Sequence, residues 1–245
     1  MNFKQALDKI IEDFFDKEAE ERKVGVYYPS DLSYPCLRRN YFEYKIPKKY
    51  EVAKLKIFQS GDLVHAWFRD VLLKNYFTSD LIKEFDFEGK LSHAGNGFEI
   101  RGRYDDFLVL KWDDEPILLE IKTVRDLRWF KEIKRHHLMQ LNFYMKCLGI
   151  AKGFLIYIDR GTLQHKVFEH KIDESLFQEI VKRAEKLHKC LLEDKIPPAE
   201  GKIEKDKKWV CNYCLFRLEC LKEGENGQIS EVGCRNKERE EGQRE

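Results

Sequence analysis

The sequence predicts a mixed α/β fold in which a central mixed sheet is flanked by helices. Apolar residues recur at helical spacing near the start of the chain, alternate with polar residues in its middle, and return to helical spacing later. Such an order of helices, strands, helix, strands and helix is typical of a sheet covered by helices. The 245 residues, 42% of them apolar, suffice for one large domain with a sizeable core.

The first 80 residues are mainly helical. Apolar spacing predicts helices over 3–20 and 57–76. The segment 24–50 between them is rich in proline and tyrosine, and we expect it to be irregular and partly helical.

Strand periodicity follows. Alternation predicts strands over 81–88, 98–110 and 116–123, with a loop at 92–97 and a polar turn at 112–115. The remaining elements are a helix over 128–148 that ends at Gly149, a strand pair over 153–159 and 164–172, and a helix over 173–194 with Asp173 as N-cap.

Composition divides the chain into four segments. We expect an N-terminal helical segment at 1–56, a core at 57–196, a compact cysteine-bearing segment at 197–221 and a charged, disordered tail at 222–245.

The charge balance limits the function classes. The 45 basic and 44 acidic residues give a net charge of +1, which argues against a protein that simply coats nucleic acid. It leaves room for an enzyme that places carboxylates beside DNA. No apolar stretch is long enough for a membrane span and the start is no signal peptide, so we expect a cytoplasmic protein without a membrane partner.

A carboxylate and a lysine lie two positions apart in an apolar strand. Glu120 and Lys122 should therefore share one face of that strand, and Asp105 or Asp106 on the preceding strand can face Glu120. Adjacent carboxylates favour a divalent cation such as Mg²⁺ or Mn²⁺. The alternative is a surface ion pair without a role.

Other polar residues border this constellation. His65 lies beside the apolar stripe of its helix, either as a core histidine or as a metal ligand, and Gln140 and Tyr144 share a helix face. A basic stretch precedes them and is either a solvated helix face or a surface that follows phosphates; its members are Arg125, Arg128, Lys131, Lys134 and Arg135, with His136 and His137.

The seven cysteines suggest a metal site rather than disulfides. Cys211, Cys214 and Cys220 form a C-x₂-C-x₅-C cluster, and Cys36, about 175 positions earlier, is the best candidate for a fourth ligand. Four thiolates suit either structural zinc or a [4Fe–4S] cluster; the lone, distant fourth cysteine favours the iron–sulfur cluster over zinc.

Together these motifs resemble a known family. The resemblance covers about residues 28–221 and is carried by Gly61-Asp62-Leu63-Val64-His65, Gly102-Arg103-Tyr104-Asp105, Glu120-Ile121-Lys122, Gln140-Leu141-Asn142-Phe143-Tyr144, Cys36-Leu37-Arg38-Arg39-Asn40-Tyr41 and the three-cysteine cluster. The chain resembles the CRISPR-associated iron–sulfur exonucleases (the "Cas four" family), in the RecB-like branch of the PD-(D/E)xK nucleases. The resemblance implies a restriction-endonuclease-like fold.

The resemblance also implies residue roles. His65, Asp105 and Glu120 would bind one Mg²⁺ or Mn²⁺ ion together with the carbonyl of Ile121, and the Gly102-x-x-Asp spacing selects Asp105 over Asp106. Lys122 would position or activate the attacking water, Gln140 would orient Lys122 or the scissile phosphate, and Tyr144 would contact DNA. The four cysteines named above would hold a [4Fe–4S] cluster joining the N-terminal and C-terminal segments.

The implied activity is metal-dependent exonuclease cleavage of DNA, with single-stranded ends preferred, during CRISPR spacer acquisition alongside the integrase proteins. Alternatives are a stand-alone DNA-repair or viral relative, a DNA-binding assembly subunit with little catalysis, and a zinc-stabilised interaction domain. The sequence leaves open whether copies of the chain form a homo-oligomer.

Overall fold

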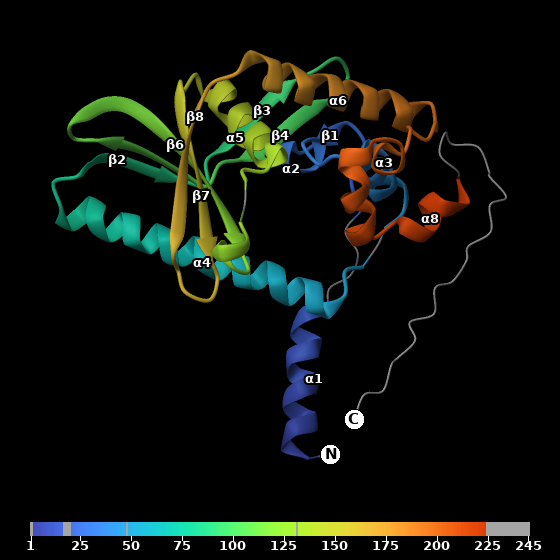
Figure 1. Ribbon diagram of the computed structural model, residues 1–245, viewed down its shortest axis with the longest axis horizontal. Helices are drawn as coiled ribbons and strands as arrows, with labels where there is room; N and C mark the ends of the chain where they lie inside the picture. The colour runs from blue at the N-terminus through green and yellow to red at the C-terminus, as the bar shows by residue number, and fades with distance from the viewer. Residues whose placement is uncertain (1, 17–20, 48, 131, 224–245) are drawn as a thin grey trace.

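The computed structural model describes residues 2–16, 21–47, 49–130 and 132–223 (Figure 1). The helices are α1 (Phe3–Phe15), α2 (Pro29–Leu32), α3 (Leu37–Lys45), α4 (Val52–Thr78), α5 (Arg135–Leu148), α6 (Glu174–Leu192), α7 (Glu200–Ile203) and α8 (Arg217–Lys222), with 3₁₀ helices η1 (Leu127–Trp129) and η2 (Lys205–Tyr213). The strands are β1 (Val26–Tyr27), β2 (Ile82–Phe87), β3 (Lys90–Ala94), β4 (Glu99–Arg103), β5 (Asp106–Leu110), β6 (Asp113–Val124), β7 (Lys152–Asp159) and β8 (His165–Lys171).

The larger sheet has five strands in the order β2-β5-β6-β7-β8. β6 and β7 run parallel, and the other neighbours are antiparallel, so the sheet is mixed as expected. β6 is the central strand, with a partner on each side. Side chains on it are therefore held by hydrogen-bonded neighbours from both directions.

The two faces of β6 pack against different helices. Ile117, Leu119 and Ile121 join a core cluster that includes Val64 of α4. Leu118 belongs to the larger cluster, which includes α5 and α6. Figure 1 shows α4 on one side of the sheet and α5 on the other. The alternation predicted for this strand thus places even-numbered residues on the α5 side.

The strand predicted over 98–110 was wrong in one respect: it is two strands in two sheets. β4 pairs with β3 and β1 in a three-stranded sheet of order β1-β4-β3, whereas β5 pairs with β2 and β6. Tyr104 and Asp105 lie between β4 and β5, outside any strand. The loop predicted at 92–97 was wrong as well, because β3 extends to Ala94 and pairs there with β4. The turn predicted at 112–115 is shorter, since β6 begins at Asp113.

The helices broadly match the prediction. Gly149 ends α5 in the left-handed conformation, with φ of +69°, and Asp173 caps α6 through its side chain. α5 begins only at Arg135, so the helix expected to start at 128 starts later; η1 ends at Trp129, and the described residues 130 and 132–134 are not helical. The predicted disorder of 222–245 falls almost wholly on residues 224–245, which lie outside the described residues.

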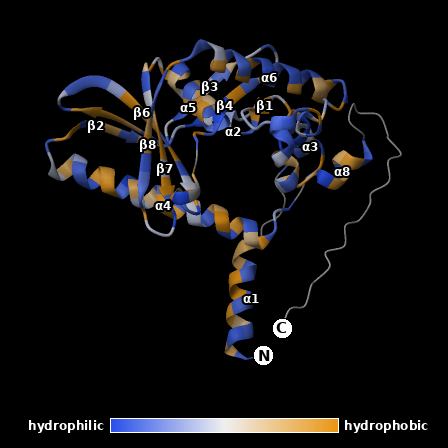
Figure 2. Ribbon diagram, in the orientation of Figure 1, coloured by the Kyte–Doolittle hydropathy of each residue, from blue (hydrophilic) through white to orange (hydrophobic). Residues whose placement is uncertain are grey.

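α1 extends away from the rest of the fold (Figure 1), and its apolar residues are largely exposed (Figure 2). In the part of the chain that the structure describes, every helix is too short or too polar to cross a membrane. The four-segment division stays a prediction, although Tyr27, Leu32 and Phe42 of the N-terminal segment lie in the same core cluster as α5 and α6.

Candidate active site

Glu120 and Lys122 lie together on the α5 side of β6. Glu120 is buried, with 1% of its surface exposed. The Lys122 ammonium donates a hydrogen bond to Glu120 Oε1, and Nζ lies 3.0 Å from Gln140 Oε1 on α5, to which it also donates. Glu120 Oε2 is buried and has no hydrogen-bond partner. A charged pair in this apolar strand is costly to bury, which argues against the ion pair without a role.

Asp105 reaches the same region from the break between the two sheets. Its Oδ2 accepts a hydrogen bond from the backbone N–H of Ile121, at 2.7 Å, which fixes the carboxylate beside β6. Its Oδ1 lies 3.5 Å from Nδ1 of His65 on α4. The chain therefore brings His65, Asp105, Ile121 and Glu120 to one place from three elements.

Gln140 and Tyr144 complete the site on the α5 side. Gln140 Nε2 donates to the Tyr144 hydroxyl at 3.1 Å, so the amide is fixed at both ends, between Lys122 and Tyr144. The Tyr144 ring packs against Gly102 of β4. A Cβ at Gly102 would lie 2.5 Å from Tyr144 Cε1, so only glycine fits without displacing the ring.

Burial dominates the electrostatics of the site. It raises the pKa of Glu120 to about 7; Lys122 opposes the shift, and the charge of Asp105 adds to it. For Lys122, burial lowers the pKa, but Glu120 and Asp105 outweigh burial and raise the pKa above its usual value. Lys122 is thus a cation held by two carboxylates.

Asp105 and His65 stabilise each other's charge. Burial raises the pKa of Asp105, but the hydrogen bond with His65 and the charge of Lys122 lower it below the usual value. Burial lowers the pKa of His65, and the hydrogen bond and charge of Asp105 more than reverse this, so the net shift is upward. Asp105 is therefore ionised at neutral pH.

The donor atoms of these residues are of the kind that binds a divalent cation. Within the described ranges, no group of three or more His, Cys, Asp and Glu side chains is already gathered as a ligand set. The donors nevertheless suit a hard ion in kind, because two carboxylates and an imidazole lie next to one another and one buried carboxylate oxygen lacks a partner. The residues thus fit such an ion in the chemistry of their donor atoms.

Asp106 occupies a different environment from Asp105. It is buried on β5, with 1% exposure, and its Oδ1 lies 3.8 Å from Nε of Arg69 on α4 without a hydrogen bond. Burial and the charge of Asp105 raise the pKa of Asp106 to about 7. The doubled aspartate therefore separates into one carboxylate at the site and one buried behind it.

The arginines of the basic stretch after β6 are partly paired with carboxylates at the surface. Arg128 pairs with Asp126, and Arg135 pairs with Glu179 of α6, a carboxylate that the local sequence does not reveal. Arg125 is exposed, and Lys131 lies outside the described residues.

His136 and His137 do not belong to a positive surface. Burial, reinforced by the charge of Lys122, lowers the pKa of His136 to about 4 and that of His137 to about 2, so both rings are neutral at pH 7. The alternative of a solvated helix face is wrong for most of the stretch, because α5 begins only at Arg135, and the surface that follows phosphates stays a prediction for its arginines and lysines.

The four candidate cluster cysteines line one cavity of about 360 Å³. Cys36 enters from just before α3, and Cys211, Cys214 and Cys220 enter from η2 to α8. All six cysteines in the described residues are free. Burial raises the pKa of Cys211 and Cys214. Sequence spacing alone thus identified four thiols that the fold brings around a common space.

Cations surround this cavity. Its lining holds five basic residues and no acidic one; they are Arg38, Arg39, Lys202, Lys208 and Arg217. Arg38 is fully buried, donates from Nε to the carbonyl of Pro197 and places Nη1 3.7 Å from Cys220 Sγ. A positive lining favours the thiolate form that a thiolate-bound group would require.

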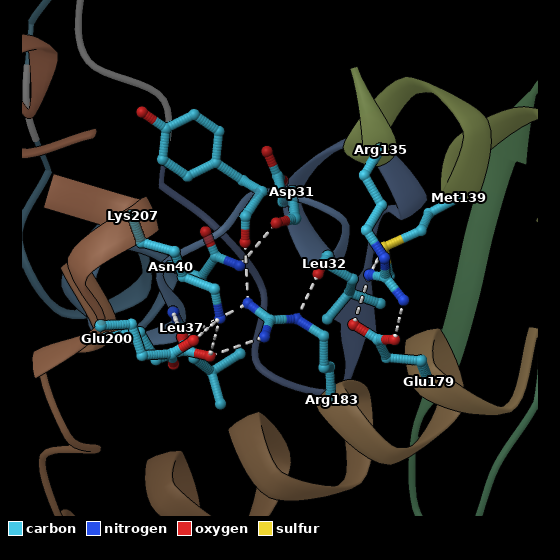
Figure 3. A network of polar contacts seen from close by, with 12 residues as sticks. Asp31, Leu32, Leu37, Asn40, Arg135, Met139, Glu179, Arg183, Glu200 and Lys207 are labelled. Carbon is cyan, nitrogen blue, oxygen red and sulfur yellow. Dashed lines mark hydrogen bonds and ion pairs between the residues drawn. The ribbon is translucent and has the colours of Figure 1, made fainter. Parts of the chain in front are cut away.

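A polar network joins the segment before Cys36 to the C-terminal segment (Figure 3). Arg183 of α6 donates to the carbonyls of Leu32 and Tyr34 at 2.6 and 2.7 Å and to Glu200 at 2.8 Å. Glu200 in turn accepts a hydrogen bond from the backbone N–H of Leu37. Sequence reasoning missed Arg183 and Glu200, because their partners in this network are more than 15 positions away and no local motif marks them. It included Arg38 in a motif but not the contacts of this residue with Pro197 and Cys220.

Comparisons with known proteins agree with this geometry. A family model described as the PD-(D/E)XK nuclease superfamily matches residues 5–220. The chain belongs to this superfamily. A curated relative, the CRISPR-associated exonuclease Cas4 of Saccharolobus solfataricus, is 28% identical over 222 residues, which cover 87% of this chain and 95% of the relative.

Two solved structures are similar to the chain to different degrees. The crystal structure of SSO0001 matches with a TM-score of 0.56 at 25% identity, and the match covers 90% of this chain and 96% of that one. The alkaline exonuclease LHK-Exo from Laribacter hongkongensis matches 76% of this chain and 95% of its own at 13% identity, with a TM-score of 0.48. The predicted kinship with the CRISPR-associated exonucleases is confirmed, as are the mixed α/β fold and the enzyme class, a nuclease with exonuclease relatives.

Proposed function

We propose that the protein is a metal-dependent DNA exonuclease that shortens single-stranded ends during the acquisition of CRISPR spacers. The superfamily supports phosphodiester hydrolysis with a divalent ion, and the Cas4 relative supports the exonuclease activity and the CRISPR role. The observation that carries the proposal is the Glu120–Lys122–Gln140 chain, in which the buried Glu120 keeps one oxygen without a hydrogen-bond partner and feels the charges of Asp105 and His65.

In this proposal His65, Asp105, Glu120 and the carbonyl of Ile121 hold one Mg²⁺ or Mn²⁺ ion. When bound, such an ion polarises a phosphoryl oxygen and lowers the pKa of a water molecule. Ionised Asp105 is prepared for this role by its hydrogen bond from the Ile121 N–H. Glu120 contributes the oxygen that now lacks a partner, and a cation favours its ionised form over the protonated one.

Lys122 supplies the proposed catalytic charge. Its ammonium is held at Glu120 and Gln140, from where it positions the attacking water or stabilises the charge that develops on the phosphate. Gln140 fixes the direction of this ammonium. Tyr144 fixes Gln140 through its hydroxyl, and because only 3% of its surface is exposed, its contact with DNA would be confined to the rim of the ring.

DNA contacts near the site are proposed for Arg125 and Arg128. Arg125 is exposed, whereas Arg128 would have to exchange Asp126 for a phosphate. Lys131, in the same stretch, is proposed from the sequence alone. These contacts would be electrostatic and therefore sensitive to salt.

We also propose that Cys36, Cys211, Cys214 and Cys220 hold a [4Fe–4S] cluster. The shared cavity and its basic lining support a negatively charged group at this place. Because Cys36 lies about 175 positions before Cys211, the cluster would join the two ends of the described fold. Anaerobically purified protein should be brown and lose its visible absorbance in Cys211→Ala. Colourless protein with stoichiometric zinc would support the zinc alternative instead.

The activity is tested with 5′- and 3′-labelled single- and double-stranded DNA in Mn²⁺, Mg²⁺ or EDTA. We expect ion-dependent shortening of single-stranded ends that is lost in Glu120→Gln, while Glu115→Gln, on the exposed part of β6, behaves like the wild type. Binding of DNA without ion-dependent cleavage would favour the assembly-subunit alternative. Equal cleavage by Glu120→Gln would remove the proposed site.

A further inference from the structure

A hollow of about 800 Å³ opens beside the candidate active site. Its lining includes Gln140 and Tyr144 of α5, Tyr28 before α2, and residues 90–92, 99 and 101–103 of the smaller sheet. Figure 1 shows α2, α5, β3 and β4 close together at this place. The groove therefore begins at the two residues that fix the direction of Lys122.

The smaller sheet leaves one edge of β4 open at the groove. β1 pairs only with Glu99 and Ile100, so the part of β4 from Arg101 to Arg103 has no strand on that side within the described ranges. On its other side β4 is fully paired with β3. The groove runs along this open edge. At Gly102 the absence of a side chain leaves room for the Tyr144 ring, with which a Cβ would collide.

The groove wall is positively charged. Arg101 and Arg103 point outward from β4, with 57% and 61% of their side chains exposed, and Lys90 of β3 lies directly opposite Arg103. The groove lining thus contains three solvent-facing cations on adjacent strands and one carboxylate, Glu99.

The surface carboxylates leave these cations available. Arg101 contacts Glu99 at 2.7 Å, and Arg103 contacts Glu88 at 3.2 Å. Both pairs are exposed, and exposed pairs contribute little energy, so each arginine can exchange its carboxylate for a phosphate. Lys90 takes part in none of the ion pairs between described residues.

An exposed aromatic ring lies at the same groove. Tyr28 is 42% exposed and lines it between the end of β1 and α2. A ring beside a row of cations is the combination by which proteins hold a single strand, because bases stack on the ring while the cations follow the backbone.

We propose that this groove binds the single DNA strand that leads to the scissile phosphate, with Lys90, Arg101 and Arg103 on its phosphates and Tyr28 against a base. The inference rests on the proposed nuclease function and adds the path of the substrate strand and the residues that hold it. Gln140 and Tyr144 line the groove, and Gln140 accepts a hydrogen bond from the Lys122 ammonium. A strand lying in the groove is therefore separated from this ammonium by the Gln140 side chain.

The test compares two triple variants with the same change in net charge. Lys90→Gln/Arg101→Gln/Arg103→Gln removes the groove cations, and Lys83→Gln/Lys111→Gln/Lys189→Gln removes exposed cations elsewhere. Binding of a short 5′-fluorescein oligothymidylate is measured by anisotropy in EDTA at several salt concentrations. We expect the groove variant to bind at least about tenfold more weakly, with a salt slope lower by about 2, because each phosphate contact to a single strand contributes about 0.7.

Equal affinity and salt slope in the two triple variants would overturn the groove. Displacement of the probe by polyglutamate as effectively as by unlabelled oligothymidylate would also overturn it, because the groove would then take an acidic peptide.

Hydrolysis of a small substrate, the p-nitrophenyl ester of thymidine 5′-phosphate, should be equal in both variants, because this substrate does not extend along the groove. Failure of the wild type to hydrolyse any substrate would contradict the proposed function, and the binding measurement would still decide the groove.

The aromatic contact has its own pair of variants. Tyr28→Phe keeps the ring and should bind the oligothymidylate like the wild type, whereas Tyr28→Ala should bind at least about fivefold more weakly with an unchanged salt slope. Thermal unfolding of Tyr28→Ala shows whether the variant is folded. Equal binding by folded Tyr28→Ala and Tyr28→Phe would remove Tyr28 from the groove contact.

Discussion

The candidate active site and the cysteine cavity bury polar groups in opposite ways. The active site takes its residues from one central strand and its neighbours, where strand periodicity and hydrogen bonds fix them. The cysteine cavity takes its residues from segments far apart in the sequence, held by short helices and by the Arg183–Glu200 network. Damage to the first should therefore remove chemistry and leave the fold, whereas damage to the second should loosen the fold.

The largest effect on stability is expected at the cysteine cavity. Cys211→Ser should lower the free energy of unfolding of the cluster-loaded protein by up to about 5 kcal/mol, because the closure of a loop of about 175 residues is lost. Cys190→Ser on α6, a free cysteine outside the cavity, is the control and should change stability little. Chemical denaturation under anaerobic conditions measures both. An equal, small effect of the two substitutions would show that no group bound in the cavity joins the two segments.

Lys122→Met should have the largest effect on catalysis. Loss of a charge placed at the developing phosphate charge should reduce the cleavage rate by about 10²–10³-fold, while the far-ultraviolet circular dichroism stays that of the wild type. Lys111→Met, at an exposed turn paired with Asp80, should keep the wild-type rate. A rate within twofold of the wild type for Lys122→Met would contradict its role.

Asp106 shows that a residue next to the active site can also affect stability, because it is buried there without a hydrogen bond at Oδ1. Its pKa of about 7 in the folded state exceeds the unfolded value, so its contribution to stability is complete below about pH 4 and is lost as the pH rises to about 7.

Asp106→Asn should therefore be more stable than the wild type by about 2–4 kcal/mol at about pH 8 and differ little at about pH 4. Urea unfolding in EDTA at both pH values measures this difference. Asp114→Asn, at an exposed position, should show no such pH dependence. A constant difference between Asp106→Asn and the wild type across this range would refute the pKa assignment.

The smallest expected effect is that of Tyr144→Phe. Removing the hydroxyl deletes the hydrogen bond from Gln140, worth about 1 kcal/mol, so turnover should fall about fivefold. The KM for DNA should change less than kcat, because the ring stays in place against Gly102. Unchanged kcat would leave Tyr144 as a packing residue.

The sequence predicted the parts of the molecule that depend on local periodicity. Residue patterns within a few positions predicted which side chains share a face of β6, the N-cap at Asp173 and the C-cap at Gly149. The Glu120–Lys122 pair is local in the same sense. The Gly102-x-x-Asp spacing also selected Asp105, which the structure places beside His65 and Ile121.

What could not be predicted depends on distant partners. Alternation in residues 98–104 breaks at Asp105-Asp106, but this local break does not show that the chain leaves one sheet there and enters another. The neutral state of His137 requires burial and the nearby charge of Lys122, and the neutralisation of Arg135 requires Glu179 from another helix. The [4Fe–4S] cluster, the ligand roles and the integrase partners stay predictions.

The most direct test of the account is binding of Mn²⁺ by the cluster-loaded protein, followed by electron paramagnetic resonance. The central claim is that the carboxylates beside Lys122 hold the divalent ion. We expect the wild type and the control Glu115→Gln to bind one Mn²⁺ with the same affinity, and Glu120→Gln to bind it at least about tenfold more weakly. Equal Mn²⁺ binding by Glu120→Gln and the wild type would contradict this claim.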